Sequence, residues 1–181
     1  MPNLLTVARI CLAPFLVSAL LDRRFTLSFI LFVVAGLTDA LDGTLARLLK
    51  QRTALGQYLD PVADKLLLST LFLVLTHMQL IPARVTVLVF GRDLAILIVA
   101  AILYAVVDRR DFKPSIFGKL NTVAQVMAVA SVLLRQIDGD AWVSWLREFS
   151  LDSTVLFTIA SGLHYAWRIT RRSNHSDAEM V

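Results

Sequence analysis

The sequence predicts an all-α protein that crosses a membrane with six helices. Hydrophobic residues make up 57% of its 181 residues and charged residues only 18%, against roughly 45–50% and about 25% in soluble domains. A domain of this size has a high surface-to-volume ratio, so it cannot bury that much apolar surface within itself. The excess apolar surface is therefore expected to face lipid.

Six apolar runs define the predicted helices, each close to the roughly 20 residues that a spanning helix needs. In chain order they are residues 4–21, 26–49, 55–78, 85–107, 116–134 and 150–167. None alternates apolar and polar residues with a period of two, so they are predicted to be helices and not barrel strands. We expect one six-helix membrane domain over residues 1–170 and a polar tail over residues 171–181.

Charged clusters mark where most of these helices end. They are Asp22-Arg23-Arg24, Lys50-Gln51-Arg52, Arg109-Arg110-Asp111 and the polar stretch 135–148. The last stretch holds Trp142 and Trp145, whose indole rings are expected at a membrane–water interface.

Basic residues predict the orientation in the membrane. With the N-terminus in the cytoplasm, the cytoplasmic side holds Lys50, Arg52, Arg109, Arg110, Lys113, Arg168, Arg171 and Arg172, and the other side holds Arg23, Arg24, Arg84, Arg135 and Arg147. Cytoplasmic loops carry the excess of Lys and Arg, so both chain ends and the tail are expected inside, in a bacterial inner membrane. The net charge of +4 lies in short clusters, which fits anionic lipid headgroups. No nucleic-acid partner is expected.

Four aspartates interrupt the second and third runs: Asp39, Asp42, Asp60 and Asp64. A charge at the centre of a spanning helix costs about 2.5–3.5 kcal/mol on insertion scales, so these side chains must be paired or must bind cations. Spacings of three and four residues place each pair on one helix face. Folding the two helices as a hairpin about Gln51 brings Asp39 level with Asp64 and Asp42 level with Asp60.

A cluster of carboxylates without His or Cys is a hard oxygen site, which suits Mg²⁺ or Mn²⁺. Two divalent cations would neutralise four carboxylates, and paired metals commonly serve phosphoryl chemistry. At about 1.5 Å rise per residue the acids lie about 13–18 Å from the turn. That turn carries Lys50 and Arg52, so the site is expected to open toward the cytoplasm.

Small residues flank the acids on both helices. Gly43 and Ala46 follow the first pair, and Gly56 lies one turn before Asp60. They either leave room for a ligand or allow close helix packing. Arg47 either binds a phosphate or extends to the interface.

These residues together resemble the signature of the CDP-alcohol phosphatidyltransferases, with all eight positions filled: Asp39-x2-Asp42-Gly43-x2-Ala46-Arg47-x8-Gly56-x3-Asp60-x3-Asp64. The resemblance implies a six-helix membrane enzyme, usually a homodimer, that transfers a phosphatidyl group from CDP-diacylglycerol to an alcohol and releases CMP. It also implies metal ligation by Asp39, Asp42 and Asp60, a general base that can also touch a metal at Asp64, and a CDP pocket of Gly43, Ala46, Arg47 and Gly56.

A second group of residues resembles the mitochondrial-type cardiolipin synthase branch of this family, whose acceptor is phosphatidylglycerol: Gly91-Arg92-Asp93, Tyr104, Lys113-Pro114-Ser115, Gly118-Lys119, Asn121, Thr122 and Gln125. Arg92 and Lys119 are cations near predicted helix starts and are expected to bind a lipid phosphate. Alternatively, Arg92 pairs with Asp93 or with one of the four aspartates, and Lys119 extends to lipid headgroups.

Three other functions stay open at this point. The acceptor could be glycerol-3-phosphate, which would make the protein a phosphatidylglycerophosphate synthase. Acids inside helices also occur in ion-coupled transporters, although these more often show a repeat or acids scattered along a path. A binding protein of the same fold is a third possibility, which the complete acid quartet argues against.

Overall fold

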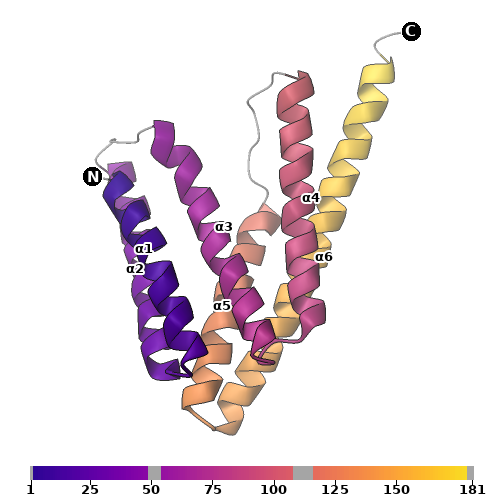
Figure 1. Ribbon diagram of the computed structural model, residues 1–181. Helices are drawn as coiled ribbons and strands as arrows, with labels where there is room; N and C mark the ends of the chain where they lie inside the picture. The colour runs from indigo at the N-terminus through magenta and orange to yellow at the C-terminus, as the bar shows by residue number, and fades with distance from the viewer. Residues whose placement is uncertain (1, 49–53, 108–115, 179–181) are drawn as a thin grey trace.

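The computed structural model describes the backbone of residues 2–48, 54–107 and 116–178, and the side chains of residues 11–38, 65–95, 98 and 118–163. These ranges hold six helices and no strand: α1 (Pro2–Leu21), α2 (Phe25–Leu48), α3 (Ala54–His77), α4 (Ala83–Val107), α5 (Ile116–Ile137) and α6 (Ala141–Ala178). The predicted all-α class is confirmed (Figure 1). The first five helices begin and end within three residues of the apolar runs.

The sixth helix differs from its prediction at both ends, because it begins at Ala141 and continues to Ala178. The carbonyl of Asp140 accepts the amide of Ser144, and Asp is a favoured residue at the start of a helix. Trp145 stacks on Phe149 one turn later, with ring centroids 5.3 Å apart. The polar stretch before residue 150 is thus helical, and Trp142 and Trp145 are exposed in its first turns.

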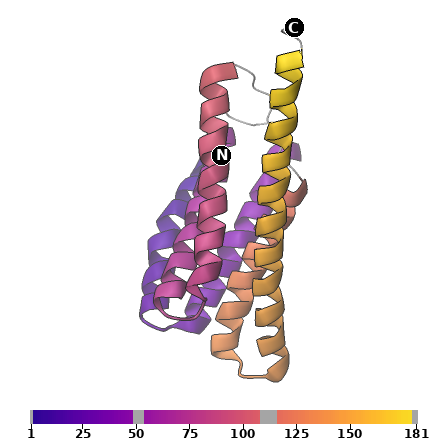
Figure 2. The same ribbon diagram turned by 90° about the vertical axis from the view of Figure 1, so that its right-hand side faces the viewer.

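The six helices run alternately up and down and spread apart toward one end (Figures 1 and 2). The N-terminal ends of α1, α3 and α5 lie at this wide end together with the C-terminal ends of α2, α4 and α6. The structure therefore brings both chain termini and the neighbouring ends of α2 and α3 to the same end of the bundle, as the sequence predicts. Helix α1 packs against both α2 and α3, and α6 packs against both α4 and α5.

The hydrophobic core fills the narrow half of the bundle and joins the first five helices to α6. Its fully buried side chains are Leu16, Leu20, Leu71, Phe72, Leu75, Ala128, Val129, Val132 and Leu133. Beyond this core, toward the middle of the bundle, described polar side chains of α3, α4, α5 and α6 contact one another.

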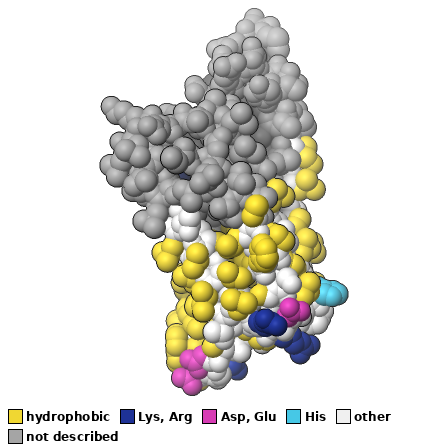
Figure 3. All heavy atoms as spheres, turned by 60° about the vertical axis from the view of Figure 1, so that its left-hand side comes forward, with side chains coloured by type: hydrophobic (Ala, Val, Ile, Leu, Met, Phe, Trp, Pro, Cys, Tyr) yellow, Lys and Arg dark blue, Asp and Glu magenta, His cyan; other side chains and the backbone are white. Residues whose placement is uncertain are grey.

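Large apolar side chains cover the outside of the described bundle. Phe15 on α1, Leu66 on α3, Val87 on α4 and Leu156 on α6 are all more exposed than buried. Figure 3 shows the hydrophobic side chains as a broad area on one face, with charged groups gathered at the narrow end. Monomeric soluble proteins rarely expose contiguous apolar surface of this kind.

Among the residues with described side chains, one helical segment is long and apolar enough to cross a membrane, Gly118–Ile137. Shorter apolar segments lie in α1, α2 and α3. The prediction of six helices is confirmed, whereas the prediction that all six span a membrane stays a prediction.

The turn after α3 contains a residue in the left-handed conformation, Gln79, with φ of 61°. The amide of Leu80 donates to the carbonyl of Leu75 at 2.8 Å, which makes this a Schellman turn. Glycine is the usual residue at that position because it has no Cβ. Arg23 holds the same conformation after α1.

We expect Gln79→Gly to stabilise the protein by about 0.5–1 kcal/mol, because it removes the cost of a left-handed L-residue. The Gln79 side chain contributes little, since its amide reaches the Thr76 carbonyl only at 3.4 Å. Thermal unfolding in detergent should show a higher midpoint for Gln79→Gly and none of that gain for Gln79→Ala, which keeps a Cβ. A lower midpoint for the glycine variant would contradict this account of the turn.

Candidate functional site

The four aspartates lie on the two helices predicted to carry them. Asp39 and Asp42 are in the C-terminal half of α2, and Asp60 and Asp64 are in the N-terminal half of α3. Both segments are α-helical, so the spacings of three and four residues place each pair on one face of its helix. Their side chains lie outside the described residues, and their convergence stays a prediction.

The small residues and the arginine of the same signature also lie on α2 and α3, and their role in binding CDP stays a prediction. Gly43, Ala46 and Arg47 lie on the last turns of α2, and Gly56 lies on the first turn of α3. All four are at the wide end of the bundle, and their side chains fall outside the described residues.

Arg92 is paired within the protein with Asp93 and Ser161. Its Nη1 donates to Asp93 Oδ1 and its Nη2 to Ser161 Oγ, both at 2.6 Å. The side chain is only 10% exposed. The alternative raised from the sequence, a local pair with Asp93, is the one observed, and the contact from α4 to Ser161 on α6 was not foreseen.

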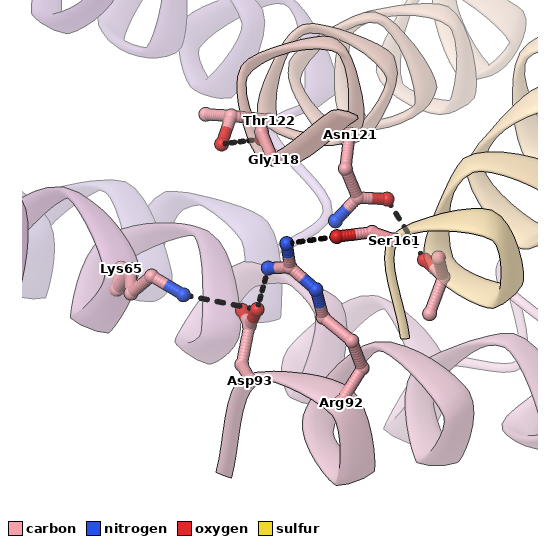
Figure 4. Close-up of polar contacts among 8 residues, drawn as sticks. Lys65, Arg92, Asp93, Gly118, Asn121, Thr122 and Ser161 are labelled. Carbon is pink, nitrogen blue, oxygen red and sulfur yellow. Dashed lines mark hydrogen bonds and ion pairs between the residues drawn. The ribbon is translucent and has the colours of Figure 1, made fainter. Parts of the chain in front are cut away.

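Asp93 also joins α4 to α3. Its Oδ1 lies 2.9 Å from Lys65 Nζ, and the two side chains are 15% and 45% exposed. One carboxylate thus accepts from two cations, so this group carries a net charge of +1. Figure 4 shows Lys65 and Arg92 approaching Asp93 from two different helices.

Asn121 on α5 lies beside this group (Figure 4), and Gln125 follows it one turn further along the same helix. Asn121 and Gln125 are one helical turn apart and are 0% and 4% exposed. Asn121 Oδ1 accepts a hydrogen bond of 2.9 Å from Thr158 on α6. In Figure 4 the amide nitrogen of Asn121 points toward Ser161 and the Arg92 guanidinium.

Three buried nitrogen donors have no hydrogen-bond partner among the described residues: Arg92 Nε, Asn121 Nδ2 and Gln125 Nε2. Leaving a buried donor unpaired costs about 1–3 kcal/mol. Arg92 Nε belongs to a cation and Asn121 Nδ2 lies close to it (Figure 4), so the partner to which these two groups would best donate is an oxygen-rich anion such as a phosphate. The sequence showed Asn121 and Gln125 but gave no sign of their burial.

Lys119, the second cation expected to bind a phosphate, is exposed on α5. Among the described residues it forms no ion pair. Its neighbour Thr122 donates to the carbonyl of Gly118 at 3.2 Å, a bond within α5. The structure therefore places Arg92 and Lys119 in different surroundings, one enclosed and one open.

The family follows from comparison with known proteins. The family model for CDP-alcohol phosphatidyltransferase matches residues 1–160. The chain belongs to the CDP-alcohol phosphatidyltransferase family. Nothing in the comparisons supports the transporter alternative.

Relatives of this family member include proteins named for two different acceptors. Human cardiolipin synthase (CMP-forming) is 37% identical over 150 residues, covering 73% of this chain and 49% of the human protein. The CDP-diacylglycerol–glycerol-3-phosphate 3-phosphatidyltransferase of Bacillus subtilis is 30% identical over 192 residues, covering 96% and 98%. A probable phosphatidylglycerophosphate synthase of Mycobacterium tuberculosis is 29% identical and covers 93% and 81%. The chain spans about half the length of the human relative.

The carboxylate ligands in the signature fit divalent metal ions. Asp39, Asp42, Asp60 and Asp64 supply only carboxylate oxygens, which are the ligands of Mg²⁺ and Mn²⁺. The part of the chain with described side chains contains no other group of three or more His, Cys, Asp or Glu that could hold a metal. The four aspartates lie outside that part.

Proposed function

We propose that this enzyme transfers the phosphatidyl group of CDP-diacylglycerol to the hydroxyl of phosphatidylglycerol, giving cardiolipin and CMP. The observation that carries the choice of acceptor is the pair of neighbouring buried side chains Arg92 and Asn121, whose unpartnered N–H groups match a lipid phosphodiester; Gln125 offers a further unpartnered N–H one turn along α5. The reaction class rests on the family and on the four signature aspartates.

In the proposed reaction, Asp64 takes the proton from the acceptor hydroxyl. The acceptor oxygen then attacks the phosphorus that carries diacylglycerol. A new P–O bond forms as the P–O bond to CMP breaks, and CMP leaves with the bridging oxygen. Two divalent cations held by Asp39, Asp42, Asp60 and Asp64 would neutralise the pyrophosphate when bound.

The remaining signature residues are assigned to the donor. Gly43, Ala46 and Gly56 would leave room for the CDP group because their side chains are absent or small. Arg47 would pair with a phosphate of the donor through its planar guanidinium.

The surroundings of Arg92 favour phosphatidylglycerol over glycerol-3-phosphate. Glycerol-3-phosphate is small and doubly charged, so it needs a tight group of cations reached from water. Phosphatidylglycerol carries one phosphodiester charge and two acyl chains. Its binding site therefore needs little positive charge and must be open to lipid on one side. The described cluster has a net charge of +1, and the nearby faces of α4 and α5 expose Leu94, Leu120 and Val123.

We also propose that all six helices span a bacterial inner membrane, with the wide end of the bundle and the acid quartet toward the cytoplasm. The exposed apolar surface supports membrane burial, and the excess of basic residues in the sequence between α2 and α3, between α4 and α5 and near the C-terminus supports the orientation. A homodimer is proposed from the family resemblance.

Product analysis with purified protein tests the acceptor. With Mg²⁺ or Mn²⁺ and labelled CDP-diacylglycerol, we expect cardiolipin and CMP when phosphatidylglycerol is supplied, and at least tenfold less product with glycerol-3-phosphate. Boiled protein and omission of acceptor are the controls. If glycerol-3-phosphate gives phosphatidylglycerophosphate readily and phosphatidylglycerol gives nothing, the acceptor assignment is wrong and only the family assignment stands.

A further inference from the structure

The charged partner of Lys65 lies on another helix. No residue three or four positions away from Lys65 in α3 is acidic, so the helix offers it no partner of its own at the spacings where side chains meet. Its Nζ instead lies 2.9 Å from Asp93 Oδ1 on α4. This ion pair therefore constrains how α3 and α4 lie against each other.

Asp93 is itself held in place by further contacts. The same Oδ1 accepts from Arg92 Nη1, and Arg92 Nη2 donates to Ser161 Oγ on α6. These contacts form a continuous chain from Lys65 on α3 through α4 to α6 (Figure 4). Because Asp93 is mostly buried, its interactions are screened less by water than those of a surface pair.

Lys65 directly follows Asp64 in α3. Fixing the Lys65 side chain against α4 fixes the adjacent helix backbone, and with it the starting point of the Asp64 side chain. A misplacement of about 1 Å can lower a reaction rate about 100-fold.

We propose that Asp93 is a positioning residue. Through its ion pair with Lys65, it holds the part of α3 that carries Asp64 at a set distance from α4 and α6. The inference rests on the proposed function in one respect, namely that Asp64 is the general base. It assigns to Asp93 no contact with the reacting atoms.

The test is a double-mutant cycle on the full-length protein in detergent micelles, assayed with whichever acceptor gives product. Lys65→Met and Asp93→Asn should each lower kcat about 10- to 100-fold, with CDP-diacylglycerol binding within threefold of wild type. The kcat of the double variant should lie no more than about twofold below that of the less active single variant, because both changes break the same contact. Asp93→Glu should recover at least part of the lost kcat.

The control is Asp152→Asn, an exposed aspartate on α6, which should keep kcat within twofold. Unfolding midpoints identify variants that merely fail to fold. In that case Lys65→Met, which leaves Arg92, Asp93 and Ser161 in contact, provides the test alone through the split between kcat and KM.

Three outcomes would overturn the proposal: unchanged kcat in both single variants, fully additive losses in the double variant, or equal losses of kcat and donor binding. The acceptor is tested separately by product analysis, and failure of the general-base role gives a different pattern, since Asp64→Asn would then retain turnover or lose donor binding together with turnover. If Asp64→Asn is inactive while Lys65→Met and Asp93→Asn are fully active, only the positioning role is wrong.

Discussion

Asp64→Asn should lose turnover by roughly 10²–10⁴-fold, the usual contribution of a general base, while still binding CDP-diacylglycerol. The amide has the shape of the carboxylate but cannot take the proton of the acceptor hydroxyl. Asp39→Asn and Asp60→Asn should instead lose donor binding and turnover together, because these residues are assigned to the metals that hold the pyrophosphate. The two classes of variant therefore separate the base from the ligands.

Binding of labelled CDP-diacylglycerol and product formation, measured on the same preparations, distinguish these roles. Asp152→Asn serves as a charge-matched control away from the signature. For wild type, EDTA should stop turnover and Mg²⁺ or Mn²⁺ should restore it, whereas full activity in EDTA would contradict the metal role of the quartet. If Asp64→Asn abolishes donor binding as completely as Asp39→Asn, Asp64 acts mainly as a metal ligand.

Most of the fold could be predicted because apolar runs of spanning length leave little choice of secondary structure. The five runs from residue 4 to residue 134 correspond to α1–α5 within three residues at each end. The sixth prediction was too short since it relied on hydropathy alone. The start at Ala141 depends on Asp140 and on the contact between Trp145 and Phe149, which polar neighbours obscure in a hydropathy profile.

The site was predicted less completely than the fold. Its aspartates could be found in the sequence, whereas the contacts between helices around Arg92 could not. The aspartates of α2 and α3 could be found because charge inside an apolar run is costly and therefore conspicuous. The partner of Lys65 could not be predicted, since Asp93 is distant in sequence and lies on another helix. Asn121 and Gln125 are polar residues in an apolar helix, and only the packing of α5 against α6 shows that their amides are enclosed.

The surroundings of Arg92 make it the substitution with the largest expected effect on acceptor use. Arg92→Ala removes a side chain that is only 10% exposed and that contacts Asp93 and Ser161. Hydrogen bonds to charged groups contribute about 1.5–3 kcal/mol, which corresponds to roughly 10- to 100-fold in acceptor KM. CDP-diacylglycerol binding should stay within threefold, because the donor is assigned to α2 and α3.

Two further variants separate binding of the acceptor phosphate from loss of structure. Arg92→Lys keeps the charge but loses the planar fork of donors, so it should restore stability more fully than acceptor KM. Lys119→Ala should have a smaller effect, because Lys119 is exposed and water screens its charge. If Arg92→Ala leaves acceptor KM unchanged while Lys119→Ala raises it tenfold or more, the phosphate binds at the open face of α5. The buried donors of Asn121 and Gln125 would then have no part in choosing the acceptor.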